Sequence, residues 1–443
     1  MSLSVGHNRS QPGPPNAFAI TGLTAVVGEE MEVREGLTLV VEGGRIARLD
    51  AGPPPGDVTV VDGSRLIATP GFVNAHTHIA DIAGKEAGFG LDSWRVVMPP
   101  DGVKVRLLAE ARDEAVVDAI RDAAHVMLAS GTTTFADFRE GGAHGLDLLE
   151  DALAGLPLRS VAFARHAAHP PHAPEDLEAN RGGLSRELKA ELERLLDRAP
   201  GWSVPLAFDV TDQGLRDTAE LVRARGKLLA THCVETDRYR TISRRRFGES
   251  DVERVVAHLR PDHIVHMTSG TDEEFELVAA AGIPVVVAPR MQSVMGIGLP
   301  PVDRMVAAGL TVALGSDNGM LASPDLLREM EYLSRATRAA RHDPTFPSPA
   351  QLLQMATING AKALGLASEL GSLSVGKRAD VVLFDAESRN LRPVRDPLAT
   401  VVNRAVAADI ACVLVDGVPA VGALPGLDVS AAGRRRVGSG GRG

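Results

Sequence analysis

Cysteine is scarce in this chain of 443 residues, which contains only Cys233 and Cys412. Two cysteines provide no disulfide framework, so we expect a protein of a reducing compartment, the cytoplasm. Long apolar runs are also missing. No uninterrupted run reaches about 18 residues, the minimum for a membrane-spanning helix. The sequence therefore predicts a cytoplasmic protein without a membrane partner.

The sequence also lacks a basic excess and is poor in aromatic residues. Its 47 Lys and Arg residues are outnumbered by 57 Asp and Glu, which gives a formal net charge of −10 and argues against nucleic acid as a partner. Aromatic residues make up only 3%, and Trp94, in the first long loop, is one of few that could stack on a substrate ring. Packing within that loop is the alternative role. We expect a small-molecule substrate and a homo-oligomer.

What the sequence does contain is a pair of histidines at the end of an apolar run. His76 and His78 close the segment 71–78, which reads as a strand. Residues i and i+2 of a strand point to the same face, so the two imidazoles can hold one metal ion. A His-x-His pair also occurs on solvated strands. The pair therefore needs further ligands nearby before it predicts a metal site.

Three further candidate ligands end later strand-like runs. His232 follows an apolar run that begins at Lys227, His266 ends a second run, and Asp317 follows a third. Helix-like stretches separate these runs, as in parallel β/α units. In a (β/α)₈ barrel the catalytic groups gather at the carboxyl ends of the strands. Three imidazoles and a carboxylate at one such end would suit Zn²⁺ or another first-row divalent ion.

The order of the strand-like runs predicts an α/β fold, a distorted (β/α)₈ barrel of the TIM type over residues 71–370. Four strands end at the candidate ligands, and the other four are expected at 132–138, 159–164, 204–209 and 283–288. Helices are expected at 114–130 and 184–197. The short strands in 17–70 and 371–421 predict one small composite β-sandwich built from both termini. Residues 1–16 read as a disordered leader and 422–443 as a flexible tail.

Several motifs resemble those of one enzyme family. The sequence resembles the amidohydrolase superfamily over roughly residues 17–421, and within it the mononuclear-metal branch of aminohydrolases. That branch includes cytosine, guanine and adenosine-type deaminases and the triazine chlorohydrolases. The matching segments are 70–78, 232–235, His266, 314–318, 356–365 and 371–380.

The resemblance implies one divalent metal ion, zinc in the first instance, with iron or manganese as alternatives. Its expected ligands are His76, His78, His232 and Asp317. Asp317 would also receive the proton of the bound water, and His266 would contact that water or the developing oxyanion. Binuclear members carry a carbamylated lysine at the end of the fourth strand. Here Asp209 and the residues after it stand there, which favours a single ion.

Glu235 lies three residues after His232, an offset that can return a side chain toward the same metal. A carboxylate there can move a proton from the water to a substrate nitrogen before the amine leaves. The alternative is a glutamate at a helix start that complements the helix dipole. The resemblance favours the catalytic role.

The predicted activity is hydrolytic deamination of an amino-substituted heterocycle by metal-bound hydroxide. Hydrolysis of another C–N bond, as in a cyclic amide or amidine, or of a C–Cl bond would use the same centre, since each is an attack on an electrophilic carbon. A non-catalytic binding or assembly relative is a further alternative. Every ligand position is filled, which argues against it.

Three arginines are expected to take part in substrate choice. Arg139, Arg165 and Arg290 each follow a strand that supplies no metal ligand, where side chains line the mouth of a barrel. A guanidinium group offers a fixed fork of donors to carbonyl or carboxylate groups. Each arginine could equally belong to a salt bridge or to the surface.

Overall fold

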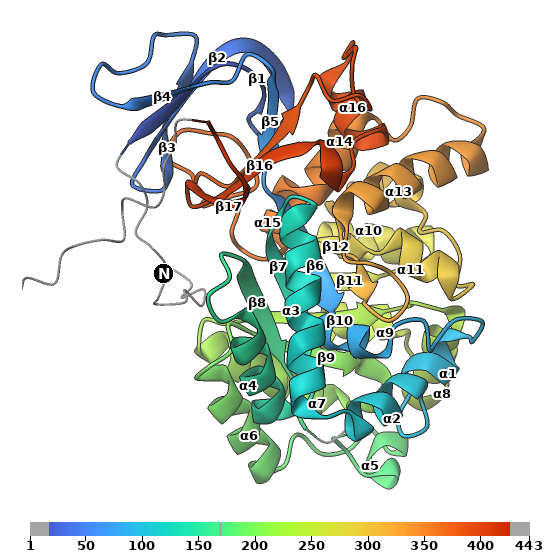
Figure 1. Ribbon diagram of the computed structural model, residues 1–443. Helices are drawn as coiled ribbons and strands as arrows, with labels where there is room; N and C mark the ends of the chain where they lie inside the picture. The colour runs from blue at the N-terminus through green and yellow to red at the C-terminus, as the bar shows by residue number, and fades with distance from the viewer. Residues whose placement is uncertain (1–16, 168–170, 426–443) are drawn as a thin grey trace, which may run out of the picture.

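The computed structural model of the chain describes residues 17–167 and 171–425. The predicted leader and residues 426–443 of the predicted tail lie outside this range. Two sheets organise the described residues, one at the centre of a barrel and one built from the two ends of the chain (Figure 1).

The barrel sheet is parallel and closes on itself. Strand β13 pairs with β12, and β14, which follows after two residues, pairs with β6, so that together they form an interrupted eighth strand. The strands are β6 (Phe72–His78), β7 (Thr132–Arg139), β8 (Arg159–Ala164), β9 (Gly201–Leu206), β10 (Leu228–Cys233), β11 (His263–His266), β12 (Val285–Val287), β13 (Val312–Leu314) and β14 (Asp317–Asn318). The predicted (β/α)₈ barrel is confirmed.

Most barrel strands are buried along their whole length. Every residue of β6, β7 and β10 is buried, as expected for parallel strands covered by helices outside and side chains inside. Helix α3 (Asp113–Ala129) illustrates the covering layer, because its apolar stripe, which includes Ile120 and Met127, faces the core. Figure 1 shows α3 running alongside the strands. The apolar positions of α3 therefore coincide with its contact surface on the barrel.

The remaining helices lie along the barrel or cover its ends. They are α1 (Ser93–Val97), α2 (Val103–Glu110), α4 (Gly142–Leu153), α5 (Pro174–Glu178), α6 (Arg186–Leu196), α7 (Asp212–Ala224), α8 (Asp237–Phe247), α9 (Asp251–Arg254), α10 (Asp272–Ala280), α11 (Pro289–Val294), α12 (Val302–Ala307), α13 (Leu326–Arg341), α14 (Pro349–Ala356), α15 (Ile358–Ala363) and α16 (Pro397–Asn403). Short 3₁₀ or π turns are η1 (Ile79–Gly84), η2 (Ala207–Asp209), η3 (Val255–Leu259) and η4 (Ala407–Asp409). None of the helices in the described residues is long and apolar enough to cross a membrane.

One predicted strand is shifted along the sequence. The expected strand 204–209 is β9, which begins at Gly201 and ends at Leu206, while 207–209 form the turn η2. Gly201 pairs with Leu228 of β10. The opening Gly-Trp-Ser carries no apolar alternation, so only the pairing with neighbouring strands reveals that the strand starts there.

The second sheet joins the two ends of the chain. Its strands are β1 (Phe18–Val27), β2 (Glu32–Glu42), β3 (Arg45–Asp50), β4 (Thr59–Asp62), β5 (Leu66–Pro70), β15 (Val381–Asp385), β16 (Ile410–Val415) and β17 (Val418–Gly422). Strand β5 pairs antiparallel with β15, which connects the early strands to the late ones. The sheet has an apolar core of its own, to which Phe18, Leu39 and Leu383 contribute. As predicted, neither end forms its sheet alone.

Candidate active site

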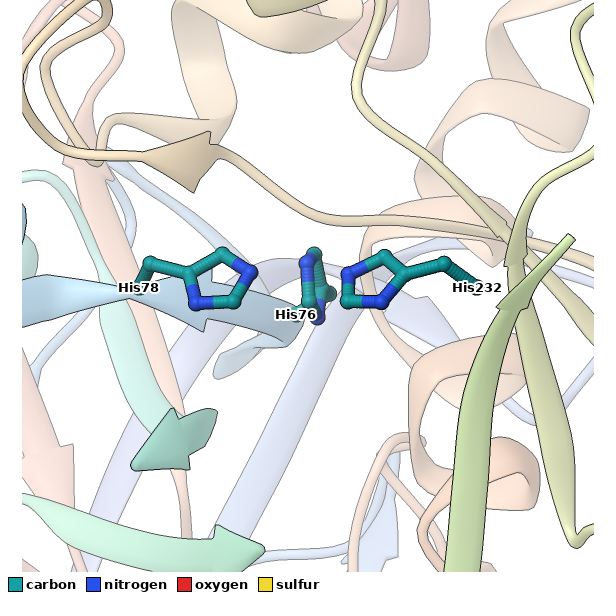
Figure 2. A group of neighbouring side chains, drawn as sticks. All are labelled: His76, His78 and His232. Atoms are coloured by element: carbon teal, nitrogen blue, oxygen red, sulfur yellow. The ribbon is translucent and has the colours of Figure 1, made fainter. Parts of the chain in front are cut away.

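Three imidazoles meet at the carboxyl ends of two barrel strands. His76 and His78 end β6 and His232 lies near the end of β10; their candidate ligand atoms all lie within 4.8 Å of one another. Figure 2 shows His76 between the other two, with His78 and His232 reaching in from opposite sides. Along the chain, three barrel strands lie between the strand of His78 and the strand of His232. The closed sheet brings them together.

Asp317 and His266 complete the cluster through an unusual backbone. Asp317 Oδ1 lies 3.4 Å from His76 Nε2 and 3.8 Å from His78 Nε2, and Asp317 Oδ2 lies 3.6 Å from His266 Nε2. The backbone of both residues lies in the left-handed region, with φ of 57° at Asp317 and 80° at His266. Non-glycine residues rarely adopt this region, and such positions cluster at functional sites. The backbone turns at these two positions and directs both side chains toward the cluster of His76, His78 and His232.

Burial and mutual charge set the protonation of the cluster. Burial lowers the pKa of His76 to about 3 and the pKa of His232 well below its usual value. Burial would raise the pKa of Asp317, but its 3.4 Å contact with His76 and the charges of His76 and His266 lower it further than burial raises it. Neutral imidazoles beside an ionised carboxylate are the forms that bind a metal ion.

The residues present fit a metal ion. Although His76 is completely buried, neither of its ring nitrogens makes a hydrogen bond within the described part of the chain. Buried polar atoms in proteins normally have a partner, and a metal ion would supply one here. Each of the other two imidazole rings is oriented by an oxygen atom that lies close to its Nδ1. His78 Nδ1 lies 3.0 Å from Glu140 Oε1, and His232 Nδ1 lies 3.0 Å from the carbonyl oxygen of Pro205.

Glu235 lies at the cavity wall and is held by a tyrosine. The Tyr239 hydroxyl donates to Glu235 Oε2 at 2.6 Å. Burial and then the charge of Glu235 raise the pKa of Tyr239 well above its usual value, so the phenol keeps its proton and acts as the donor. Tyr239 lies on α8, four residues after Glu235. The second carboxylate oxygen of Glu235 is left for other contacts in the cavity.

A cavity opens in front of the cluster. Its empty space, counted together with the open solvent at its mouth, is about 640 Å³. His78, His232, His266, Asp317 and Glu235 line it on the side of the cluster. Its wall is formed by Val97, Met98, Pro99, Lys104, Val105, Arg165, Pro205, Leu206, Tyr239, Met295 and Asn318. Most wall residues are apolar, which suits a flat ring.

The four expected substrate-binding residues lie in different places. Arg165 lines the cavity. Arg139 is 4% exposed, and its Nε donates to the carbonyl of Glu140. Neither Arg139 nor Arg290 belongs to the cavity wall as formed by the described residues.

Two of these residues contact other side chains instead of lining the cavity. Arg290 Nη1 lies 3.2 Å from Glu329 Oε1 and also donates to the carbonyl of Ser323, which turns it toward α13. The Trp94 ring lies 3.5 Å from the Arg238 guanidinium carbon and packs against the apolar cluster that includes Met98 and Tyr239. All three arginines lie at or just after a strand end, so the sequence did not distinguish Arg139 and Arg290 from Arg165. The distinction depends on the partner that each side chain contacts in the folded protein.

The structure adds groups that the sequence analysis did not single out. Lys104 Nζ lies 2.7 Å from Glu140 Oε1 and 2.9 Å from Asp81 Oδ2. Glu140 directly follows the charged end of β7, and Tyr239 stands four residues after Glu235, so both had a local signal. Lys104 had none, because it lies in the long segment between β6 and α3.

Comparison with known proteins gives a family and several relatives. The model of the amidohydrolase family matches residues 67–420. A putative aminohydrolase of Methanothermobacter thermautotrophicus is 31% identical over 405 residues, 91% of this chain and 98% of the relative. A 5-methylthioadenosine/S-adenosylhomocysteine deaminase of Moorella thermoacetica is 30% identical over 81% of this chain and 82% of its own length. The crystal structure of an adenosine deaminase from Xanthomonas campestris with bound zinc superposes with a TM-score of 0.79 at 23% identity, covering 95% of this chain and 97% of that one, which shows a shared fold.

Proposed function

Because the chain belongs to the amidohydrolase family, as its sequence motifs predicted, we propose that it deaminates an amino-substituted heterocycle of the aminopurine type. It is a metal-dependent hydrolase that acts on carbon–nitrogen bonds other than peptide bonds. In the proposed reaction, water adds at the ring carbon that carries the amine. A C–O bond forms, the C–N bond breaks, and ammonia leaves.

The observation that carries the proposal is the convergence of two kinds of group in one cavity. Three histidines and an ionised aspartate can hold a metal ion, and a carboxylate at the wall can move a proton. Deamination needs both, since the ring nitrogen must gain a proton before the amine can leave. The aminopurine class is supported by relatives described as deaminases of 5-methylthioadenosine and S-adenosylhomocysteine and of 5'-deoxyadenosine.

We assign a single divalent ion, zinc in the first instance, to His76, His78, His232 and Asp317. The buried ring of His76, which makes no hydrogen bond within the described residues, supports this assignment, as do the contacts that orient His78 and His232. When bound, such an ion lowers the pKa of a coordinated water to about 7 and so supplies a nucleophile at neutral pH.

The protein groups around the reacting carbon have separate tasks in this proposal. Glu235, held by Tyr239, passes one proton of the attacking water to the ring nitrogen. Asp317, ionised and 3.6 Å from His266, accepts the other proton of the water and gives it to the amine, which leaves as ammonia. His266 donates to the developing oxyanion, and Gln292, which lies 3.3 Å from His266 Nδ1, orients the imidazole.

Ammonia release and metal content test the proposal together. Zinc-loaded protein is assayed with 5'-methylthioadenosine, S-adenosylhomocysteine, adenosine, guanine and cytosine. Glu235→Gln should keep the metal and lose roughly 10²–10⁴-fold in turnover, the usual contribution of a general acid or base. Glu276→Gln, on the exposed side of α10, is the matched control and should behave as wild type.

Other outcomes would each change one part of the assignment. Loss of zinc in Glu235→Gln would make Glu235 a ligand. Unchanged turnover would mean that Glu235 only complements the dipole of the helix that follows it. No ammonia from any of these rings would reject deamination of this class.

A further inference from the structure

Two positive side chains face the cavity, with carboxylates behind them. Lys104 and Arg165 line the cavity, whereas their partners Asp81 and Glu140 are not among the described residues that do. The only carboxylates on the cavity wall among the described residues are Glu235 and Asp317, which the proposed reaction uses. The substrate therefore meets cations on one part of the wall and proton-handling groups on another.

Lys104 is fixed in place by its buried partners. Its side chain is 7% exposed, and Nζ lies 2.7 Å from Glu140 Oε1 and 2.9 Å from Asp81 Oδ2. An ammonium group has three N–H donors. Two carboxylates lie within ion-pair distance of this group, and the residue lines the cavity. The long, flexible side chain has thus lost its freedom before any ligand arrives, which is a favourable arrangement for recognition.

Arg165 lies on the same side. Its Nη2 is 3.4 Å from the same oxygen, Glu140 Oε1, and its side chain is 22% exposed. This contact is long for a charge-assisted hydrogen bond. The guanidinium group carries five N–H donors, and it also borders a second, smaller cavity with Pro205 and Trp202. Arg165 can therefore offer donors to a ligand without breaking a tight ion pair.

Glu140 links the two cations of the cavity wall, Lys104 and Arg165, to one side of the metal centre. It contacts His78 Nδ1 at 3.0 Å as well as Lys104, so Lys104 lies on the His78 side. Glu235 follows β10, the strand of His232. Figure 2 shows His78 and His232 on opposite sides of His76. A ring whose reacting carbon lies over the centre would turn one edge to Glu235 and the other to Lys104 and Arg165.

We propose that Lys104, supported by Arg165, determines substrate specificity by binding an oxygen substituent, a ring carbonyl or a carboxylate, on the edge of the aminoheterocycle that lies away from Glu235. The proposal rests on the function proposed above and narrows its substrate class to aminoheterocycles that carry such an oxygen on the ring, as guanine does and adenine does not. The proton-handling edge requires a ring nitrogen, and the Lys104 edge requires an oxygen acceptor. A buried ion pair with a purely structural role would stabilise the protein without distinguishing rings that have this oxygen from rings that lack it.

Matched pairs of rings test the proposal in the zinc-loaded protein. Cytosine is compared with 4-aminopyrimidine, and guanine with 2-aminopurine, because each pair differs in a ring carbonyl and the proton on the ring nitrogen beside it. The carboxylate arm compares 4-aminopyrimidine-2-carboxylate with 4-aminopyrimidine. Calorimetry measures binding to Glu235→Gln, which holds the ring without turning it over. The oxygen-bearing member of at least one pair should bind about 10- to 100-fold more tightly, the range for a hydrogen bond to a charged group.

Variants then assign that preference to Lys104. Adding Lys104→Met should abolish the difference within a pair, so that the oxygen-bearing and oxygen-free members bind equally. Lys189→Met, whose lysine pairs with Asp217 outside the cavity, should keep the full difference. If Lys104→Met leaves too little folded protein, Arg165→Met is used and should reduce the difference by at least about threefold.

The outcomes separate this inference from the proposed function. Equal binding within all three pairs, no binding of any member, or a preference that survives Lys104→Met overturns the role of Lys104. A preference that depends on Lys104 in a protein that releases no ammonia from any ring supports the binding role and rejects the deamination.

Discussion

The contact between Glu140 and His78 shows how single residues tune the candidate centre. Burial and the charge of Lys104 would lower the pKa of His78, but Glu140 and Asp317 raise it overall. The pKa of Glu140 itself lies well below its usual value, since burial is outweighed by Lys104, Arg165 and His78. Glu140 is therefore an anion that fixes the ring of His78 and aims Nε2 at the cluster, as carboxylates do behind histidine ligands.

Glu140→Gln should weaken zinc binding about 10- to 100-fold, because partners of this kind typically contribute that much to affinity. Competition with a chromophoric chelator measures the change independently of activity. Glu191→Gln is the matched control, since Glu191 lies 2.8 Å from His166 in a pair away from the metal cluster. Equal affinities in the two variants would mean that Glu140 does not act on His78.

At the scale of elements, the interrupted eighth strand decides where Asp317 stands. Gly315 lies between β13 and β14, and a Cβ atom there would lie 2.8 Å from the carbonyl oxygen of His76 and 2.9 Å from its Cβ. The close approach allows the Ser316 amide to donate to the His76 carbonyl at 3.1 Å. Strand closure and the placement of Asp317 thus depend on the same contact.

We expect Gly315→Ala to destabilise the fold by about 1–3 kcal/mol, the usual cost of overpacking, and to weaken zinc binding by moving Asp317 from His76. Urea unfolding and chelator competition measure the two effects. Gly56→Ala is the control, because no atom lies within 4 Å of its added Cβ. Full zinc affinity in Gly315→Ala would show that the strand can adjust without moving Asp317.

A histidine in strand β11 gives the barrel a dependence on pH. His263 is completely buried, its Nδ1 lies 3.1 Å from the Ala363 carbonyl, and burial lowers its pKa to about 4. In the unfolded chain its pKa is about 6.5. Between these values the unfolded chain takes up a proton that the folded chain does not. The stabilising contribution is therefore complete above pH 6.5 and is lost as the pH falls toward 4.

Urea unfolding between pH 7 and pH 4 should show this loss, about 3 kcal/mol for His263 by proton linkage. Other buried histidines add to the total, so the comparison is between slopes. His263→Asn should flatten the acid limb, and His144→Asn, which removes an exposed imidazole beside Asp113, should not. Identical slopes in all three proteins would assign the pH dependence to other groups.

At the scale of the whole molecule, a buried ion cluster joins the barrel to the terminal sheet. Arg159, at the start of β8, has Nη1 at 2.7 Å from Asp380 Oδ2 and Nη2 at 3.1 Å from Asp416 Oδ2. Asp380 precedes β15 and Asp416 lies in the turn between β16 and β17. The pKa of Arg159 is raised, because these carboxylates outweigh its burial. The cluster holds the late strands against the barrel.

Arg159→Met should reduce the free energy of unfolding by about 3–5 kcal/mol, because it leaves Asp380 buried without its cation. Arg335→Met removes an exposed i,i+4 pair with Glu331 and should change the stability by less than about 0.5 kcal/mol. Chemical denaturation followed by circular dichroism compares them. A small effect of Arg159→Met would mean that water reaches the carboxylates once the arginine is removed.

Local sequence was sufficient for the family, the barrel and most strand positions. The family match confirms the first, and β7 and β8 begin where the apolar patterns predicted. It also identified His76, His78 and His232 as neighbours, because parallel strands present their carboxyl ends on one side of a barrel. A hydrophobic strand followed by a polar side chain is a local pattern, and the closed sheet turns that pattern into proximity.

Only the tertiary structure decided which charged residues face the cavity. Arg165 and Arg290 have the same kind of position in the sequence, yet Arg290 is turned away by Glu329, which lies 39 residues later. Lys104 reaches the cavity because Asp81 and Glu140, on different elements, hold its ammonium group there. The direction of a long charged side chain depends on the partners it finds in space. Those partners are set by the packing of distant elements and not by the neighbouring residues.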